Sequence, residues 1–218
     1  MEILIGIGAV VLFVLMVIGI SIIFGKRRTN ALKKIADTLN LTFQGDSAES
    51  LLELITDFSL LSKGYSPEFR DVMAGRFKEM DIFITDYKYN QPFSRLSPSQ
   101  TVIVICSGLL HLPSFNIEHE SLAHKINLAV GYEKIDFDFD EHPVFSKQYV
   151  LQGPDEEAIR KFFTPEIIAC FEQHKKLCAE GRGNVLLVFR HDHLVSLKNY
   201  RSFLAEALEV YMLMKNRK

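Results

Sequence analysis

The sequence has no tryptophan, only three cysteines among 218 residues, and no strong excess of charge of either sign. Cys106, Cys170 and Cys178 are odd in number and irregularly spaced. They therefore fit neither a disulfide framework nor a CxxC zinc motif, and we expect free thiols. A formal net charge of −2 provides no overall field for nucleic acid, so nucleic acid is not an expected partner.

Sequence signatures of the common catalytic classes are missing as well. The chain contains no HExxH, no Gly-x-Ser-x-Gly, no Walker A motif and no dinucleotide-binding fingerprint. We therefore assign no catalytic, cofactor-binding or metal-binding residue from the sequence, and we expect no cofactor. The sequence leaves the biochemical activity open.

What the sequence does contain is a long apolar run near its N-terminus. Residues 3–24 carry no charge, and sixteen of these 22 residues are Leu, Ile, Val or Phe. As a helix they would be about 33 Å long, close to the roughly 30 Å hydrocarbon core of a bilayer. A cleaved signal peptide would need a basic N-terminal flank and a shorter apolar stretch. We predict a transmembrane anchor over residues 1–25 and one domain over residues 26–218.

The flank of this run predicts its orientation. Lys26, Arg27 and Arg28 follow it directly, and we predict that they lie at the membrane interface. Basic residues stay on the cytoplasmic side, which places the C-terminal domain in the cytoplasm. The same cluster can meet anionic headgroups, although a stop-transfer flank explains it equally well. The small residues Ser21 and Gly25 have a spacing that allows helix pairing, so a homodimer is one expected form.

Hydrophobic periodicity changes along the rest of the chain. Helices are expected at both ends of the domain, with strands between them, which indicates an α+β fold with a mainly antiparallel sheet and flanking helices. The expected helices cover residues 30–40, a short segment after 46, 121–129, 155–163, 165–177 and a long C-terminal helix over 196–215. The expected strands cover residues 69–77, 81–89, 101–107, 114–119, 134–139, 149–151, 178–180 and 185–189.

Two polar segments are candidate sites. The alternating acids Asp136, Asp138 and Asp140 would share one face of a strand and could offer oxygen ligands to Mg²⁺ or Ca²⁺. An acidic stripe opposite buried Phe residues is also what a half-exposed strand looks like. His191-Asp192-His193 follows a strand, where catalytic groups often lie, and could bind a metal or move protons. A polar loop between a strand and a helix explains it as well.

Two segments resemble a known family. Asp81–Tyr89 (DIFITDYKY) is similar to an FDYxY-like strand, and His142–Glu156 (HPVFSKQYVLQGPDE) is similar to an FSxxYxLxGxDE segment followed by a helix. Both resemble features of uncharacterised bacterial proteins with one N-terminal span and a C-terminal cytoplasmic α+β domain. The resemblance implies a single-pass protein of the bacterial inner membrane. That family has no assigned activity, so the resemblance implies no functional residue.

Three functions stay open at this point. The leading hypothesis is a non-enzymatic interaction or sensing module, tethered to the cytoplasmic face of the inner membrane and near its protein partners. The alternative is a membrane-attached, metal-dependent hydrolase that uses the His191-Asp192-His193 region, with or without the acidic stripe. A lipid- or nucleotide-binding domain would need an apolar cavity, which a sequence cannot show.

Overall fold

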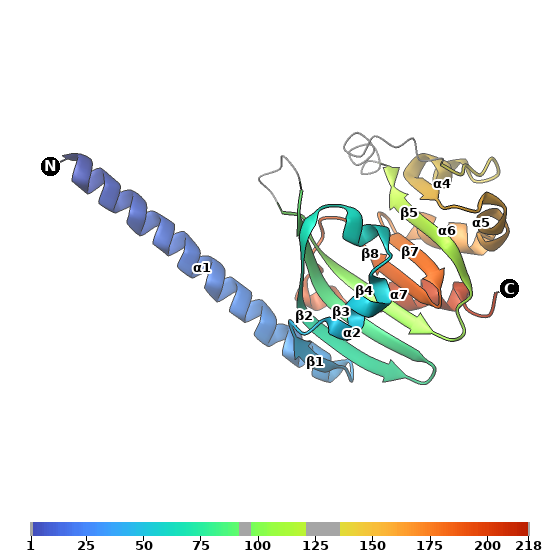
Figure 1. Ribbon diagram of the computed structural model, residues 1–218, viewed down its shortest axis with the longest axis horizontal. Coiled ribbons are helices and arrows are strands. Elements are labelled where there is room, and N and C mark those ends of the chain that lie inside the picture. The colour runs from blue at the N-terminus through green and yellow to red at the C-terminus, as the bar shows by residue number, and fades with distance from the viewer. Residues whose placement is uncertain (1, 92–96, 121–135, 218) are drawn as a thin grey trace.

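The computed structural model describes residues 2–91, 97–120 and 136–217. Its first element is a single helix, α1 (Glu2–Thr38), which passes the predicted domain boundary at residue 25 without a break. The N-terminal part of α1 projects away from the domain, and only its C-terminal part meets the sheet (Figure 1). No helix in the described part of the chain combines the length and the apolar character needed to cross a membrane.

The domain is built on one eight-stranded sheet in which every pair of neighbours is antiparallel. The strand order is β1-β2-β3-β4-β8-β7-β5-β6. These strands are β1 (Thr42–Gly45), β2 (Tyr65–Phe77), β3 (Met80–Asn90), β4 (Ser99–Ser107), β5 (Leu112–His119), β6 (Tyr149–Gln152), β7 (Cys178–Gly183) and β8 (Val185–Phe189). The mainly antiparallel α+β fold predicted from the sequence is confirmed, and the apolar run 101–107 is part of the inner strand β4.

Helices cover both faces of the sheet. Along β4, Ile103 and Ile105 pack into the larger core, whereas the alternating Val102 and Val104 pack into a smaller one on the opposite face. The smaller core lies under α2 (Glu49–Ile55) and the 3₁₀ turn η1 (Ser59–Ser62). The larger core is covered by the end of α1 and by α4 (Pro143–Gln148), α5 (Glu156–Phe162), α6 (Pro165–Gln173) and α7 (Tyr200–Met214). The 3₁₀ turn η2 (Leu197–Asn199), which has no buried residue, leads into α7.

Several sequence-based boundaries are wrong for local reasons. No helix starts at residue 30, because α1 arrives there already formed. Residues 136–139 are not a strand, because the Asp136 carboxylate, and not a backbone carbonyl, accepts the Leu151 N–H at 2.9 Å. The expected C-terminal helix is divided into η2 and α7. The short elements β1 and α4 were not predicted, and the helix expected over 121–129 lies outside the described residues.

Candidate functional site at the foot of the N-terminal helix

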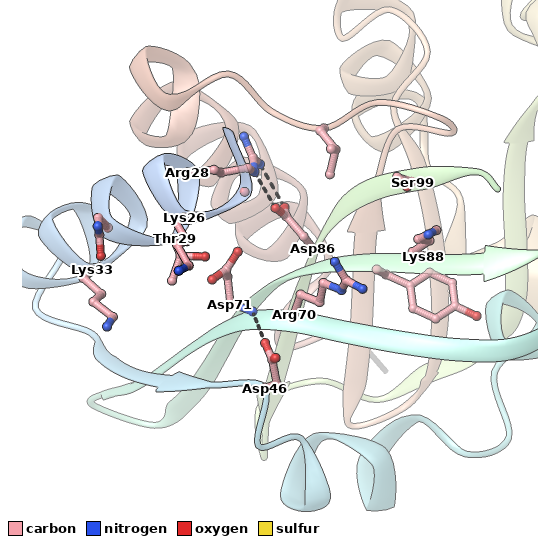
Figure 2. Close-up of a pocket in the computed structure, with 14 residues that line it drawn as sticks. Lys26, Arg28, Thr29, Lys33, Asp46, Arg70, Asp71, Asp86, Lys88 and Ser99 are labelled. Carbon is pink, nitrogen blue, oxygen red and sulfur yellow. Dashed lines mark hydrogen bonds and ion pairs between the residues drawn. The ribbon is translucent and has the colours of Figure 1, made fainter. Parts of the chain in front are cut away.

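A pocket of about 620 Å³ lies where α1 meets the sheet (Figure 2). We call it the α1 pocket. One wall comes from α1, starting at Gly25, the last residue of the predicted anchor. The other comes from the loop after β1, from β2, β3 and β4, and from the segment after β8. Its lining residues are Gly25, Lys26, Arg28, Thr29, Asn30, Lys33, Asp46, Arg70, Asp71, Asp86, Tyr87, Lys88, Ser99 and Leu194.

Arg28 joins the two walls of this pocket. Its guanidinium donates to both carboxylate oxygens of Asp86 on β3, from Nε at 2.6 Å and from Nη2 at 3.0 Å. Burial disfavours the charged guanidinium, but the hydrogen bonds and the negative charge of Asp86 outweigh it and raise the pKa of Arg28. Two parallel charge-assisted hydrogen bonds fix the orientation of the guanidinium as well as its distance from the carboxylate. This contact therefore helps to set the angle at which α1 packs on the domain.

Groups from the C-terminal part of the chain complete this contact. Arg28 also donates to the Val195 carbonyl at 3.1 Å and to the Tyr200 hydroxyl at 3.0 Å. The Thr101 hydroxyl donates to Asp86 Oδ1 at 2.8 Å and accepts the Val195 N–H at 3.0 Å. The result is a closed network in which the Arg28 charge is satisfied by four acceptor atoms from β3, from the segment before η2 and from α7.

An irregularity in β2 brings a second acid into the pocket. The pairing of β2 with β3 shifts between Arg70 and Met73, and Asp71 in this bulge has a left-handed backbone with φ +53°. The Asp71 N–H donates to the Asp46 carboxylate at 3.2 Å. Burial raises the pKa of the Asp71 carboxyl, against a hydrogen bond from the Thr29 side chain. Within the pocket, Asp71 therefore contacts both Thr29 of α1 and Asp46.

The lining of the α1 pocket carries a net positive charge. Five basic residues (Lys26, Arg28, Lys33, Arg70 and Lys88) face three acids (Asp46, Asp71 and Asp86). Since Arg28 and Asp86 neutralise each other, the remaining cations outnumber the remaining acids by two to one. Arg70 also pairs with the exposed Glu68 at 2.7 Å. Lys26, Lys33 and Lys88 are the lysines that this geometry offers to an anionic ligand.

The structure places the three predicted interface residues in different settings. Lys26 lines the α1 pocket and Arg28 binds the domain, whereas Arg27 is exposed and is not part of the lining. Their predicted position at a membrane interface stays a prediction. No sequence pattern predicts Asp86 as the partner of Arg28, because that contact joins residues 58 positions apart.

His191 belongs to a buried network on the opposite face of the sheet. Lys63 Nζ lies 2.5 Å from Glu118 Oε1 and 2.8 Å from His191 Nε2, and all three side chains are at most 7% exposed. An ammonium group can only donate, so Nε2 accepts and the imidazole is neutral. Burial lowers the pKa of His191 in the same direction. This histidine is therefore a structural acceptor and is not open to a substrate.

The two segments of the metal-dependent hydrolase hypothesis, His191–His193 and Asp136–Asp140, do not provide a set of metal ligands in the described residues. The backbone N–H of Asp192 donates to the Gln100 side chain at 3.2 Å, and the His193 carbonyl accepts the Thr101 N–H at 3.1 Å. Neither His191–His193 nor Asp136–Asp140 belongs to a group of three His, Cys, Asp or Glu ligand atoms within 4.8 Å, as far as the described residues go. The described residues of these segments therefore do not form the metal site that the hydrolase hypothesis requires.

A second buried carboxylate, Glu180 on β7, lies near Lys63 and was not predicted. Its side chain is almost fully buried, and only Oε2 has a hydrogen-bond partner in the described chain, the Ser59 N–H at 2.8 Å. Burial raises the pKa of Glu180, while the charge of Lys63 opposes this rise. The charge of Lys63 instead holds the pKa of Glu118 well below its usual range, against its burial. The pKa values of Glu118 and Glu180, which both lie near Lys63, are thus shifted in opposite directions.

No family model and no curated protein matches the chain. One solved structure, the crystal structure of the mycobacterial trehalose monomycolate transport factor A (TtfA), is similar in fold, with a TM-score of 0.59. The match covers 87% of this chain and 96% of that chain, at 11% sequence identity. This likeness shows a shared fold and does not by itself transfer a function.

Replacing Arg28 by Met should loosen the attachment of α1. The change leaves Asp86 partly buried with one charged donor fewer, and we expect a loss of about 1.5–3 kcal/mol in the free energy of unfolding. Protease cleavage of α1 on the C-terminal side of residue 28 should also become faster in this variant, because the helix is held less firmly against the domain. Denaturant unfolding of the full chain in an uncharged detergent measures the first effect. Arg27→Met, which removes an exposed neighbouring charge, is the control, and equal losses in both variants would contradict this role of Arg28.

Glu180 should make stability depend on pH. Its pKa is raised in the folded protein above an ordinary value of 4.5. Its contribution is therefore complete below that value and is lost as the pH rises through the folded-state pKa. Glu180→Gln should remove this loss, so the difference in melting temperature, variant minus wild type, should increase between about pH 4.5 and pH 8. The exposed Glu53→Gln should show a flat difference, and a flat difference for Glu180→Gln would contradict the prediction.

Proposed function

We propose that this chain is a single-pass, membrane-anchored, non-enzymatic interaction module, and that its α1 pocket binds an anionic headgroup at the cytoplasmic face of the inner membrane. The observation that carries the proposal is the position of the pocket. Its lining begins at Gly25, one residue after the apolar run ends. An anchor in the bilayer would hold this pocket at the depth of the headgroups.

The apolar run supports the anchor. Eight large apolar side chains between residues 12 and 23 of α1 are 44–71% exposed. The domain covers none of these eight, and water-exposed apolar surface of this extent on one element marks a binding or membrane surface. The basic residues Lys26 to Arg28 follow, as expected for the cytoplasmic end of a span.

The charge of the pocket supports an anionic ligand. Lys26, Lys33 and Lys88 reach it from α1 and from β3. Each lysine near a membrane surface adds about 1 kcal/mol of attraction to anionic lipid. Arg28 is already engaged by Asp86 and therefore shapes the site without being free to move with a ligand.

The geometry supports binding more than catalysis. The carboxylate of Asp86 is held by Arg28, Thr101 and Tyr200, so it is not free to accept a proton from a substrate. The neighbour in fold, TtfA, is named as a transport factor, a name that describes handling of a molecule and not a bond-breaking step. We infer a role in holding or presenting a membrane component or a partner bound to it.

The anchor predicts how the protein fractionates. The full chain should stay in the membrane pellet after alkaline carbonate extraction. Leu12→Arg with Leu15→Arg should release it, because each central arginine costs about 2.5–3.5 kcal/mol on insertion scales. Leu52→Arg with Leu197→Arg, at exposed positions outside the run, should stay in the pellet. Recovery of the unmodified full chain in the soluble fraction would refute the anchor.

The pocket predicts selective binding of an anionic headgroup. Calorimetric titration of the full chain in uncharged detergent should show saturable binding of short-chain phosphatidylglycerol and none of short-chain phosphatidylcholine. Lys33→Gln with Lys88→Gln removes two of the pocket cations and should weaken binding at least about tenfold. The measurement is the dissociation constant at fixed ionic strength, because screening reduces such interactions.

A charge-matched control separates the pocket from general attraction. Lys147→Gln with Lys161→Gln removes two exposed lysines far from the pocket lining and should leave the affinity unchanged. Equal weakening in both double variants would mean a diffuse electrostatic effect and would overturn the assignment. A parallel titration with inorganic phosphate shows whether the phosphate group alone is sufficient or the lipid is required.

A further inference from the structure

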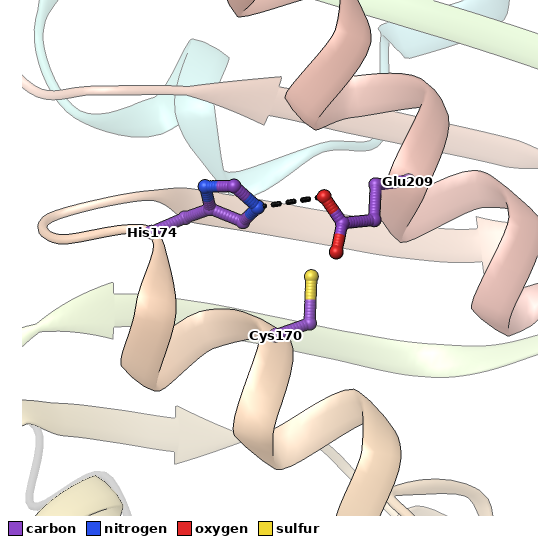
Figure 3. A group of neighbouring side chains, drawn as sticks. All are labelled: Cys170, His174 and Glu209. Carbon is purple, nitrogen blue, oxygen red and sulfur yellow. Dashed lines mark hydrogen bonds and ion pairs between the residues drawn. The ribbon is translucent and has the colours of Figure 1, made fainter.

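A separate cluster of potential metal ligands lies between α6 and the C-terminal helix α7. Cys170 and His174 are four residues apart at the end of α6, and Glu209 comes from α7. Their ligand atoms all lie within 4.8 Å of one another (Figure 3). His174 Nε2 is 2.9 Å from Glu209 Oε2. The three side chains therefore converge on one point from two helices.

The donor types select the ion. A thiol, an imidazole and a carboxylate are the ligands that Zn²⁺ uses, at about 2.0–2.3 Å from the ion. Mg²⁺ and Ca²⁺ prefer oxygen ligands alone, so the sulfur and the imidazole argue against them. Three protein ligands leave one position of a tetrahedral ion for water. Rotamer changes of the partly exposed His174 and Glu209 side chains can bring the ligand atoms to such distances from one ion.

The cluster is accessible to a metal ion from solvent, and hydrogen bonds of the His174 backbone hold it in place. Cys170 is almost fully buried, whereas the side chains of His174 and Glu209 are 21% and 48% exposed. An ion can therefore enter between the two outer ligands and reach the sulfur beneath them. The backbone of His174 is fixed, since its N–H donates to the Cys170 carbonyl at 3.0 Å and its carbonyl accepts the Tyr149 hydroxyl at 3.1 Å. Such outer contacts orient metal ligands.

We propose that Cys170, His174 and Glu209 bind one Zn²⁺ ion, with water as the fourth ligand, and that this ion fastens α7 to α6. The Cys170 thiol loses its proton to solvent when the Zn–S bond forms. In the metal-free protein the thiol is protonated, because burial and the carboxylates of Glu209 and Glu206 raise its pKa to about 12. The resting arrangement is then a His–Glu pair over a neutral thiol.

The test is metal binding by the full chain, purified in detergent without a histidine tag and stripped with a chelator. Equilibrium dialysis should give one tightly bound Zn²⁺ per chain, and the melting temperature should rise because the ion binds only the folded protein. His174→Gln and Glu209→Gln should each weaken binding by more than about 100-fold, because the loss of an outer contact alone costs about 10- to 100-fold. Both residues are partly exposed, so these variants should fold normally.

Cobalt substitution tests the sulfur directly. Co²⁺ in place of Zn²⁺ should give a sulfur-to-cobalt charge-transfer band in the near ultraviolet, together with the visible bands of a tetrahedral ion. Cys170→Ser should abolish the charge-transfer band, whereas Cys106→Ser, at a cysteine outside the cluster, should keep it. Zinc affinity that is unchanged in His174→Gln and Glu209→Gln, or a cobalt complex without the sulfur band, would overturn the proposal.

Discussion

The ion pair between Arg28 and Asp86 is the contact on which the arrangement of this protein depends. A helix that leaves the domain has few ways to keep a fixed direction, because its outer part projects away from the fold (Figure 1). Here the guanidinium reaches Asp86 with two hydrogen bonds and adds Val195 and Tyr200 from the far end of the sequence. Losing one partner of a partly buried pair leaves the other charge unsatisfied. This contact, together with the buried Leu32 and Ala36 of α1, holds the two walls of the α1 pocket together.

The antiparallel sheet keeps two charge systems apart. Alternation along β3 and β4 sends Asp86 and Thr101 to the face of α1 and α7, and sends Gln100 to the face of η1. On that second face, Lys63 with Glu118 and His191 is enclosed and satisfied mainly by protein groups. Burial there disfavours exchange with solvent or ligand, whereas the α1 pocket is open. The same sheet thus carries a structural network on one face and a candidate binding site on the other.

The sequence predicted the elements better than it predicted the sites. Local patterns are sufficient for an apolar strand such as 101–107, because that signal lies within a few residues. Arg28 looked like one of three equivalent flanking cations, and nothing nearby distinguishes it from Arg27. Its role depends on Asp86, which only the packing of α1 against the sheet brings to it. Lys63 and Glu118, and equally Cys170 and Glu209, are distant in sequence, so no spacing rule identifies them.

Helix α7 connects the two proposed sites. Tyr200 at its start contacts Arg28 and Asp86, and Glu209 belongs to the cluster with Cys170 and His174. Nine residues of helix separate them by about 13.5 Å along the axis. A helix of this length moves as a rigid unit, so any displacement of α7 is shared by both ends. Binding energies coupled through one element are reciprocal. An ion that fixes α7 against α6 therefore also fixes the position of the hydroxyl that completes the Arg28–Asp86 contact beside the α1 pocket.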